Sequence, residues 1–199
     1  MFNQNQVLGN LKSSINDISG LSEENWEILS SCLTISKFPK GGFLLKTGEF
    51  CGSVFFIHEG YCRSYQDTDE KEININFHFE NEFVTNITSY IKKERSDYSI
   101  QTCENVVVVI IEKNKLIDRT YKSSLEFEIF GRKMLEFMIM KQDEHLSLFK
   151  LYTPQQRYEY IENNRPEILR RVALTQIASY LGVTRETLTR IRKKKLSRI

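Results

Sequence analysis

The feature that most constrains the fold of this chain is the segment from Leu174 to Ile191, close to the C-terminal end of the sequence. Gly182 lies in its middle and can adopt a left-handed backbone conformation at no steric cost, so it can end one short helix and turn the chain. Thr184 can then cap a second helix through its hydroxyl. The segment therefore predicts a helix-turn-helix, whose contact residues are Ile177, Ala178, Leu181, Val183, Leu188 and Ile191.

The outward face of the second helix carries side chains that suit DNA. Arg185, Glu186 and Arg190 can read base edges from a major groove, because arginine bonds guanine O6 and N7 and glutamate accepts from cytosine N4. Neighbouring polar residues are predicted to contact phosphates, namely Gln176, Thr184, Thr187, Thr189, Arg192 and Lys193. The alternative is an ordinary helical hairpin with a charged, solvated face.

Basic residues are concentrated around this segment. The chain of 199 residues has a formal net charge of +2, but the residues from Thr153 onward include 11 Lys and Arg against 4 Asp and Glu. The other 17 basic and 22 acidic residues leave the rest of the chain at −5. A basic module on a mildly acidic body indicates that phosphate attraction is confined to one end of the chain.

Cysteine and histidine spacing argues against a metal or redox centre. The four cysteines (Cys32, Cys51, Cys62 and Cys103) are too far apart in sequence for a zinc or iron–sulfur motif, and the three histidines are dispersed. We expect reduced thiols, no metal, no iron–sulfur cluster and no haem. With no signal-peptide pattern and no membrane-spanning apolar run, we expect a cytoplasmic protein without a membrane partner.

Before Thr153 the pattern changes from helical to strand-like and back to helical. Residues 7–18 and 23–29 have apolar residues at helical spacing, with Ser22 placed to cap the second helix. Short apolar or alternating runs, separated by turn signals, then predict strands at 43–45, 54–57, 61–65, 73–79, 98–102 and 106–111. Strands at such short, regular intervals imply a compact barrel or roll.

Two of these strands have distinct patterns. Ile73, Ile75, Phe77 and Phe79 alternate with polar residues, which predicts a strand with one buried face. The run 106–111 consists of six consecutive β-branched residues, which predicts a strand buried on both faces.

The residues from 125 to 149 are predicted to form one long helix. One apolar set follows a heptad rhythm and is expected to form a dimer contact: Phe127, Phe130, Met134, Phe137 and, less strictly, Lys141. A second set on a neighbouring face comprises Leu135, Met138, Ile139 and Leu146. Two apolar faces predict one contact with the chain's own roll and one with a partner, although a plain core helix would carry similar residues.

This order of elements resembles the Crp/Fnr family of bacterial transcription regulators. Residues 46–63 look like the family's roll signature, in which a Gly-Glu turn precedes a strand that ends in a glycine turn. Residues 184–191 are similar to its recognition helix, where an Arg, a Glu and a second Arg read bases. The resemblance implies a homodimer on double-stranded DNA, with RNA polymerase as a further partner.

The resemblance completes the predicted architecture, an α+β chain. We expect a double-stranded β-helix (jelly-roll-like) domain with N-terminal helices at residues 1–122, a long dimerisation helix at 123–151, and an all-α helix-turn-helix domain at 152–199. Pro154 suits the first position of a new helix at the last boundary. Many relatives add a β-hairpin wing, but only nine residues follow Arg190, so a full wing is not expected.

The predicted effector site departs from the family pattern. Members that bind cyclic nucleotides use a Gly-Glu pair, which is missing from residues 83–86, and an Arg-Ser or Arg-Thr pair, which Arg95-Ser96 matches. Asp97 would repel an anion there, so a cyclic nucleotide is doubtful and no cofactor is identified. An unknown effector would be held by Tyr61, Arg63, Arg95, Ser96 and Tyr98, although a filled aromatic core explains the two tyrosines as well.

The leading hypothesis is a sequence-specific, homodimeric DNA-binding transcription regulator that reads a two-fold-symmetric operator, with an unknown small-molecule effector in the roll. The alternative is a sensor of a cyclic nucleotide or another metabolite whose DNA binding is weak or lost. An enzyme has little support, because no nucleophile, phosphate-binding loop or metal-ligand spacing is recognisable, and no catalytic residue is assigned.

Overall fold

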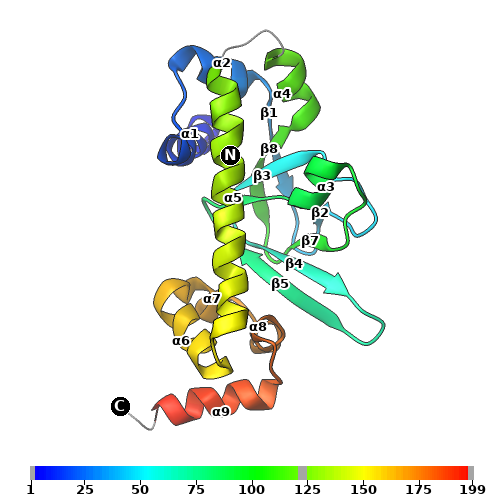
Figure 1. The fold of residues 1–199 in the computed structure, drawn as a ribbon, viewed down its shortest axis with the longest axis vertical. Coiled ribbons are helices and arrows are strands. Elements are labelled where there is room, and N and C mark those ends of the chain that lie inside the picture. Colours follow the sequence, from blue (N-terminus) through cyan, green and yellow to red (C-terminus); the bar gives the residue numbers. More distant parts are fainter. Residues whose placement is uncertain (1–2, 121–124, 197–199) are drawn as a thin grey trace. The chain divides into compact units, whose positions relative to one another are not determined.

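The computed structural model of the chain describes residues 3–120 and 125–196 (Figure 1). It divides into two compact units, one formed by Met1–Ser64 and His78–Met138 and the other by Tyr65–Phe77 and Ile139–Ile199. The boundaries cut through two strands and one long helix, so both units contain pieces that are distant in sequence. The domain limits expected from the sequence stay predictions.

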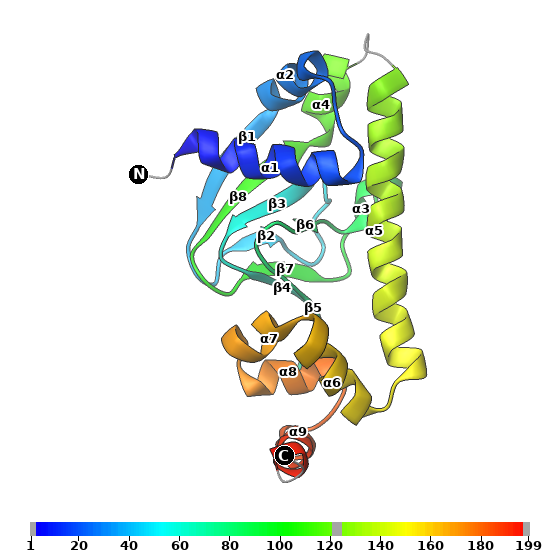
Figure 2. The same ribbon diagram turned by 90° about the vertical axis from the view of Figure 1, so that its left-hand side faces the viewer.

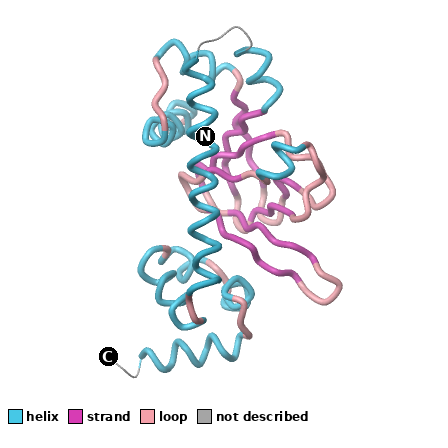
Figure 3. Tube along the Cα trace, viewed as in Figure 1, coloured by secondary structure: helices cyan, strands magenta, loops and turns pink. Residues whose placement is uncertain are grey.

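The strands form the predicted roll of two four-stranded sheets, which belongs to the first unit except for residues 65–77 (Figure 3). The first sheet has the order β1 (Leu33–Phe38), β8 (Val106–Glu112), β3 (Ser53–Glu59) and β6 (Phe83–Val84), with antiparallel pairing. The second has the order β2 (Phe43–Leu45), β7 (Ser99–Thr102), β4 (Cys62–Asp67) and β5 (Glu72–His78).

Helices flank the first sheet. They are α1 (Gln4–Ile18), α2 (Glu23–Ser31), α3 (Ile87–Lys92), α4 (Lys113–Thr120) and the first part of α5 (Leu125–Leu151). The Ser22 hydroxyl accepts a hydrogen bond from the Asn25 N–H and caps α2, as predicted. Asn86 caps α3 in the same way, through the Ser89 N–H.

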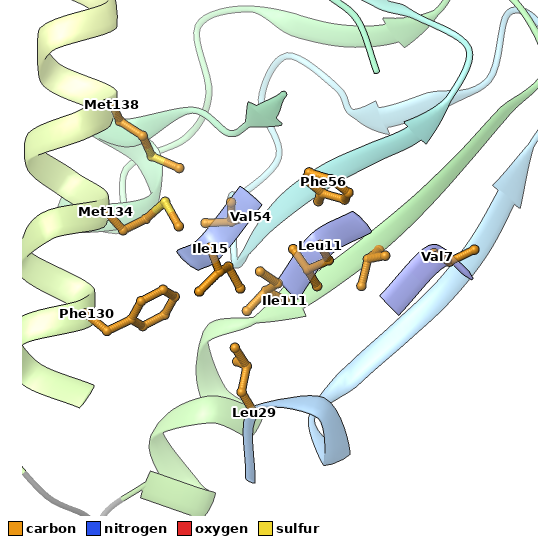
Figure 4. Packing of buried hydrophobic residues seen from close by; sticks show 11 residues of the cluster. Val7, Leu11, Ile15, Leu29, Val54, Phe56, Ile111, Phe130, Met134 and Met138 are labelled. Atoms are coloured by element: carbon orange, nitrogen blue, oxygen red, sulfur yellow. The ribbon is translucent and has the colours of Figure 1, made fainter. Parts of the chain in front are cut away.

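Two apolar clusters form the core of this unit. One lies inside the roll and joins both sheets, with Ile57 and Val108 from the first and Cys62 and Ile100 from the second. The other covers the outer face of the first sheet, where α1 crosses the strands (Figure 2). Figure 4 shows side chains of α1, α2 and α5 meeting those of β3 and β8 there: Val7, Leu11, Ile15, Leu29, Val54, Phe56, Ile111, Phe130, Met134 and Met138.

Strand β8 contributes side chains to both apolar clusters. Val106 and Val108 point into the roll, whereas Val109 and Ile111 belong to the cluster under the helices, so the prediction of a strand buried on both faces is confirmed. Its partner β1 was missed by the sequence interpretation, which placed no strand before residue 43. Every β1 residue pairs with β8, from Leu33 opposite Ile111 to Phe38 opposite Val106.

The prediction for β5 was wrong in its first half. Ile73 is 38% exposed whereas Asn74 is only 5% exposed, the reverse of a strand with one buried apolar face. Phe77 is fully buried, as predicted. The cause is the neighbour of this segment, because the Asn74 N–H donates to the Ser179 hydroxyl (3.0 Å) and the strand is covered there by a helix.

The second unit is helical apart from the β4–β5 segment. It contains the rest of α5 followed by α6 (Pro154–Asn164), α7 (Pro166–Arg171), α8 (Leu174–Leu181) and α9 (Arg185–Leu196). Thr153 and Gln156 form a capping box with Pro154 in the first turn of α6, as the sequence predicted for the cap. The α+β class, the roll and the helix-turn-helix are confirmed.

None of the described helices is both long enough and apolar enough to cross a membrane.

Candidate nucleic-acid interface

The turn between α8 and α9 has the predicted geometry. Gly182 has φ +69° and ψ +34°, a left-handed conformation, and the Val183 N–H donates to the Ala178 carbonyl (3.0 Å). The Thr184 hydroxyl accepts from the Thr187 N–H (3.2 Å) and caps α9. Local chemistry therefore sets the angle at which α9 leaves α8.

A small apolar core holds α9 in place. Leu181 and Leu188 are fully buried, and Ile177 and Ala178 are buried beside them. Burying an aliphatic side chain of this size stabilises a fold by about 1.5–3 kcal/mol, so this core anchors α9 firmly.

Arg157 supports the turn and was not singled out from the sequence. Its guanidinium donates to the carbonyls of Tyr152 (3.0 Å), Leu181 (3.0 Å) and Phe149 (2.8 Å), and it lies 4.7 Å from the Phe149 ring centroid. It thereby satisfies carbonyls at the ends of α5 and α8, where helices lack internal partners. An arginine early in a helix has many possible roles, so spacing alone could not reveal this one.

The predicted base-reading residues lie together on the outer face of α9. Arg185, Glu186 and Arg190 are exposed and line an open hollow with Thr189, Lys193 and Lys194. Among the residues that the structure describes, no hydrogen bond or ion pair engages the side chains of Arg185, Glu186 or Arg190. Their donors and acceptors are thus available to a ligand.

The predicted phosphate contacts fall into two groups. Arg192 and Lys193 are exposed, and Gln176 is half-buried in α8. The threonines have partners within their own segment: Thr184 donates to the Thr187 hydroxyl (3.1 Å), and Thr189 donates to the Arg185 carbonyl (2.9 Å). The roles of all six residues stay predictions.

The basic side chains in the C-terminal part of α9 differ in whether they are free to bind a phosphate. Lys195 forms an ion pair with Glu162 of α6, which ties the end of α9 to its own unit. Arg192 and Lys193 are therefore better placed than Lys195 to meet a phosphate.

We expect His145 to make the stability of the second unit depend on pH. Its Nδ1 lies 3.3 Å from the Tyr180 hydroxyl, and burial, followed by the nearby Arg165 charge, holds the pKa of His145 below its ordinary value. Below about pH 6.5 the unfolded chain takes up a proton that the folded chain resists, so stability falls as the pH falls.

We expect the melting temperature to be lower at about pH 5.5 than at about pH 7.5, and a His145→Gln variant to lose much of that difference. Glu144, whose pKa is lowered chiefly by the Tyr160 hydroxyl, loses its contribution only below the ordinary pKa of 4.5, outside this window. A variant that keeps the full pH dependence would contradict the assignment.

Helix α5 turns most of its first apolar set inward. Phe130 and Met134 are buried in the first unit's core, and Phe127 and Phe137 are half-buried against it, whereas Lys141 is exposed. Their role in a dimer stays a prediction. The apolar residues that α5 leaves exposed include Leu125, Ile139 and Leu146, two of which belong to the second predicted set.

The five residues of the predicted effector pocket have partners within the chain, and their role in binding an effector stays a prediction. Tyr61 stacks on Phe79 with ring centroids 5.1 Å apart. The buried guanidinium of Arg63 donates to the Gln101 side-chain oxygen (2.9 Å). Arg95 lies near Ser96 and Tyr98 in sequence, but its exposed guanidinium donates to the Gly48 carbonyl (2.6 Å).

The segment around Ser96 satisfies its own polar groups. The Asn86 amide donates to the Ser96 hydroxyl (2.8 Å) and to Asp97 (3.2 Å), and Ser96 donates to the Tyr98 carbonyl (2.6 Å). Burial raises the pKa of the Tyr98 hydroxyl, which donates to the Thr85 carbonyl (3.2 Å). These contacts suit a filled core more than an open anion site. No group of three or more His, Cys, Asp or Glu among the described residues could hold a metal ion.

Residues 35–119 match the family model described as the cyclic nucleotide-binding domain. The chain as a whole has the fold of Crp/Fnr regulators. No curated protein matches the sequence.

Three solved structures illustrate the similarity. A putative Crp/Fnr transcriptional regulator from Eubacterium rectale is 19% identical, with a TM-score of 0.64 over 89% of this chain and 85% of its own. The c-di-GMP-responsive global regulator CLP of Xanthomonas campestris is 16% identical (TM-score 0.63; 88% and 92%). FixK2 of Bradyrhizobium japonicum is 16% identical (TM-score 0.63; 83% and 85%). At these identities the similarity establishes the fold.

Proposed function

We propose that the chain is a sequence-specific DNA-binding transcription regulator of the Crp/Fnr type, which acts as a homodimer on a two-fold-symmetric operator. The single observation that carries the proposal is the outer face of α9, where Arg185, Glu186 and Arg190 are exposed together on a helix anchored by Leu181 and Leu188. Side chains with unused hydrogen-bonding groups on an anchored helix are what base recognition in a major groove requires.

Charge and fold support the same function. The excess of basic residues beyond Thr153 would draw this unit to phosphates, with Arg192 and Lys193 positioning α9 rather than specifying sequence. The similar structures are described as regulators, which supports a non-enzymatic role and RNA polymerase as a further partner.

The exposed apolar residues of α5 support dimerisation with a second copy. Leu125, Leu135, Ile139 and Leu146 are 10, 4 and 7 residues apart along one helix, so they fall on a and d positions of one heptad pattern, as in a coiled-coil seam. Leu125, Ile139 and Leu146 are all exposed in the single chain. A two-fold contact along this seam would pair each residue with its own copy and match the symmetry of an operator.

An Ile139→Glu variant should therefore dissociate into monomers, because it would place two carboxylates opposite each other in an apolar seam. Light scattering coupled to size-exclusion chromatography measures the mass directly. Met140→Glu is the matched control, since Met140 is equally exposed but lies off the seam, and it should stay dimeric. A wild-type monomer at micromolar concentration, or dissociation of both variants alike, would contradict the proposed seam.

Selection of bound duplexes from a random DNA pool tests the proposed function as a whole. We expect a two-fold-symmetric site whose half-sites are centred about 34 Å apart, one turn of the duplex. Recovery of no motif by the wild-type chain would refute sequence-specific binding, and recovery of a single half-site would refute the dimer.

The match to the cyclic nucleotide-binding domain favours a second candidate, a small-molecule sensor whose DNA binding is weak or lost. Thermal shift against a panel of nucleotides and metabolites separates the two. Under the leading proposal the wild-type chain selects duplexes, and an effector found in the panel changes that affinity. A ligand that stabilises the chain while no duplex is selected would favour the sensor.

A further inference from the structure

The hairpin formed by β4 and β5 is divided between the two units. Its residues Tyr65–Phe77 group with the helices of the second unit, while Cys62–Ser64 and His78 at its base group with the roll. The chain therefore passes between the units three times, twice through neighbouring strands and once through α5.

Helix α8 binds the backbone of β5 through one serine. The Ser179 hydroxyl accepts from the Asn74 N–H (3.0 Å) and donates to the Glu72 carbonyl (3.2 Å), so both of its hydrogen-bonding functions are used by the strand. The next residue, Tyr180, packs its ring against that of Phe77, with centroids 5.4 Å apart and both side chains buried.

Arg165, at the start of α7, binds the same strand further along. Its guanidinium donates to the Asn76 side-chain oxygen (3.1 Å) and to the Phe77 carbonyl (2.8 Å), and its Nε lies 3.5 Å from Glu167, which orients it. Ser179, Tyr180 and Arg165 thus contact β5 at Glu72, Asn74, Asn76 and Phe77, and three of these contacts are hydrogen bonds to backbone atoms.

We propose that residues 65–77 are a structural part of the DNA-binding unit and that Ser179 and Arg165 are positioning residues for DNA recognition. This inference rests on the proposed function. Ser179 lies in α8, three residues before the turn at Gly182. The strand to which Ser179 is hydrogen-bonded therefore fixes the position of α8. Because the turn sets the angle between α8 and α9, the strand also fixes the position of α9.

The test uses the full chain and two mild variants. Ser179→Ala removes only the hydroxyl, and Arg165→Lys keeps the positive charge, so neither changes the electrostatic attraction to DNA. Thr175→Ala is the matched control, because Thr175 is an exposed hydroxyl residue on the same helix. Amide hydrogen exchange reports on the Asn74 N–H, and competition binding reports affinity for the selected duplex.

We expect Ser179→Ala to speed exchange at Asn74 at least tenfold and both variants to weaken specific DNA binding about three- to tenfold, with an unchanged salt slope. Thr175→Ala should change neither quantity. Wild-type affinity in both variants, or fast exchange at Asn74 in the wild-type chain, would overturn the inference alone. A wild-type chain that selects no duplex would instead overturn the proposed function, while the exchange data still report whether the strand is docked.

Discussion

Replacing Gly60 by alanine should lower the free energy of unfolding by about 2–4 kcal/mol, the largest stability effect that we expect from a single small substitution. Gly60 has φ +83°, which alanine adopts only with strain. An added Cβ would also lie 2.5 Å from the Asn105 carbonyl oxygen, a backbone atom that cannot move aside without shifting the start of β8. Chemical denaturation of the purified variant measures the loss.

Gly48→Ala separates the two causes. Gly48 has nearly the same conformation, φ +84°, but a Cβ there would meet nothing within 4 Å. It should therefore cost only the conformational strain, about 1–2 kcal/mol. Equal losses in the two variants would show that the close approach to Asn105 contributes nothing.

Replacing Arg190 by alanine should weaken binding to the selected operator by about 1–3 kcal/mol and relax specificity at one base pair. The reason is geometric, because an exposed arginine without a partner among the described residues can bond guanine O6 and N7 at once. Arg190→Lys keeps the charge but loses the bidentate geometry, so it should also relax specificity.

Lys193→Ala provides the contrast. As a phosphate contact, Lys193 should contribute equally to the binding of all DNA sequences. Its removal should therefore lower the affinity for every duplex and reduce the salt slope by about one. Affinities for the operator and for single-base variants at several salt concentrations distinguish these outcomes. Uniform losses from both alanine variants would overturn the assigned roles.

The elements best predicted from the sequence are those set by neighbours within one or two turns. The cap at Thr153, the proline that follows it and the left-handed Gly182 each depend on groups no more than five residues away, and the structure shows all three. The buried residues Ile177, Leu181 and Leu188 follow from helical spacing for the same reason. Strand β1 was not predicted because its pairing partner, β8, lies some seventy residues away in the sequence.

The candidate site likewise contains residues that local sequence predicts and residues that it does not predict. Its exposed residues Arg185, Glu186 and Arg190 follow from one helix and one cap. Arg157 could not be found in this way, because its three carbonyl partners come from the ends of two helices and the segment between α5 and α6. Spacing also could not show that Tyr61 stacks on Phe79 and that Arg63 donates to Gln101, because these contacts join different strands.

By itself the sequence determined most of the helices and strands, though not β1, and the helix-turn-helix with its outward face, because periodicity and caps act over a few residues. Only the tertiary structure decided which face of α5 enters the chain's own core and that β5 turns Asn74 inward and Ile73 outward. The physical reason is that an apolar or polar face specifies burial or exposure but not the partner. The hydrogen-bond partner of the Asn74 N–H is Ser179, a residue 105 positions away that only folding brings into contact.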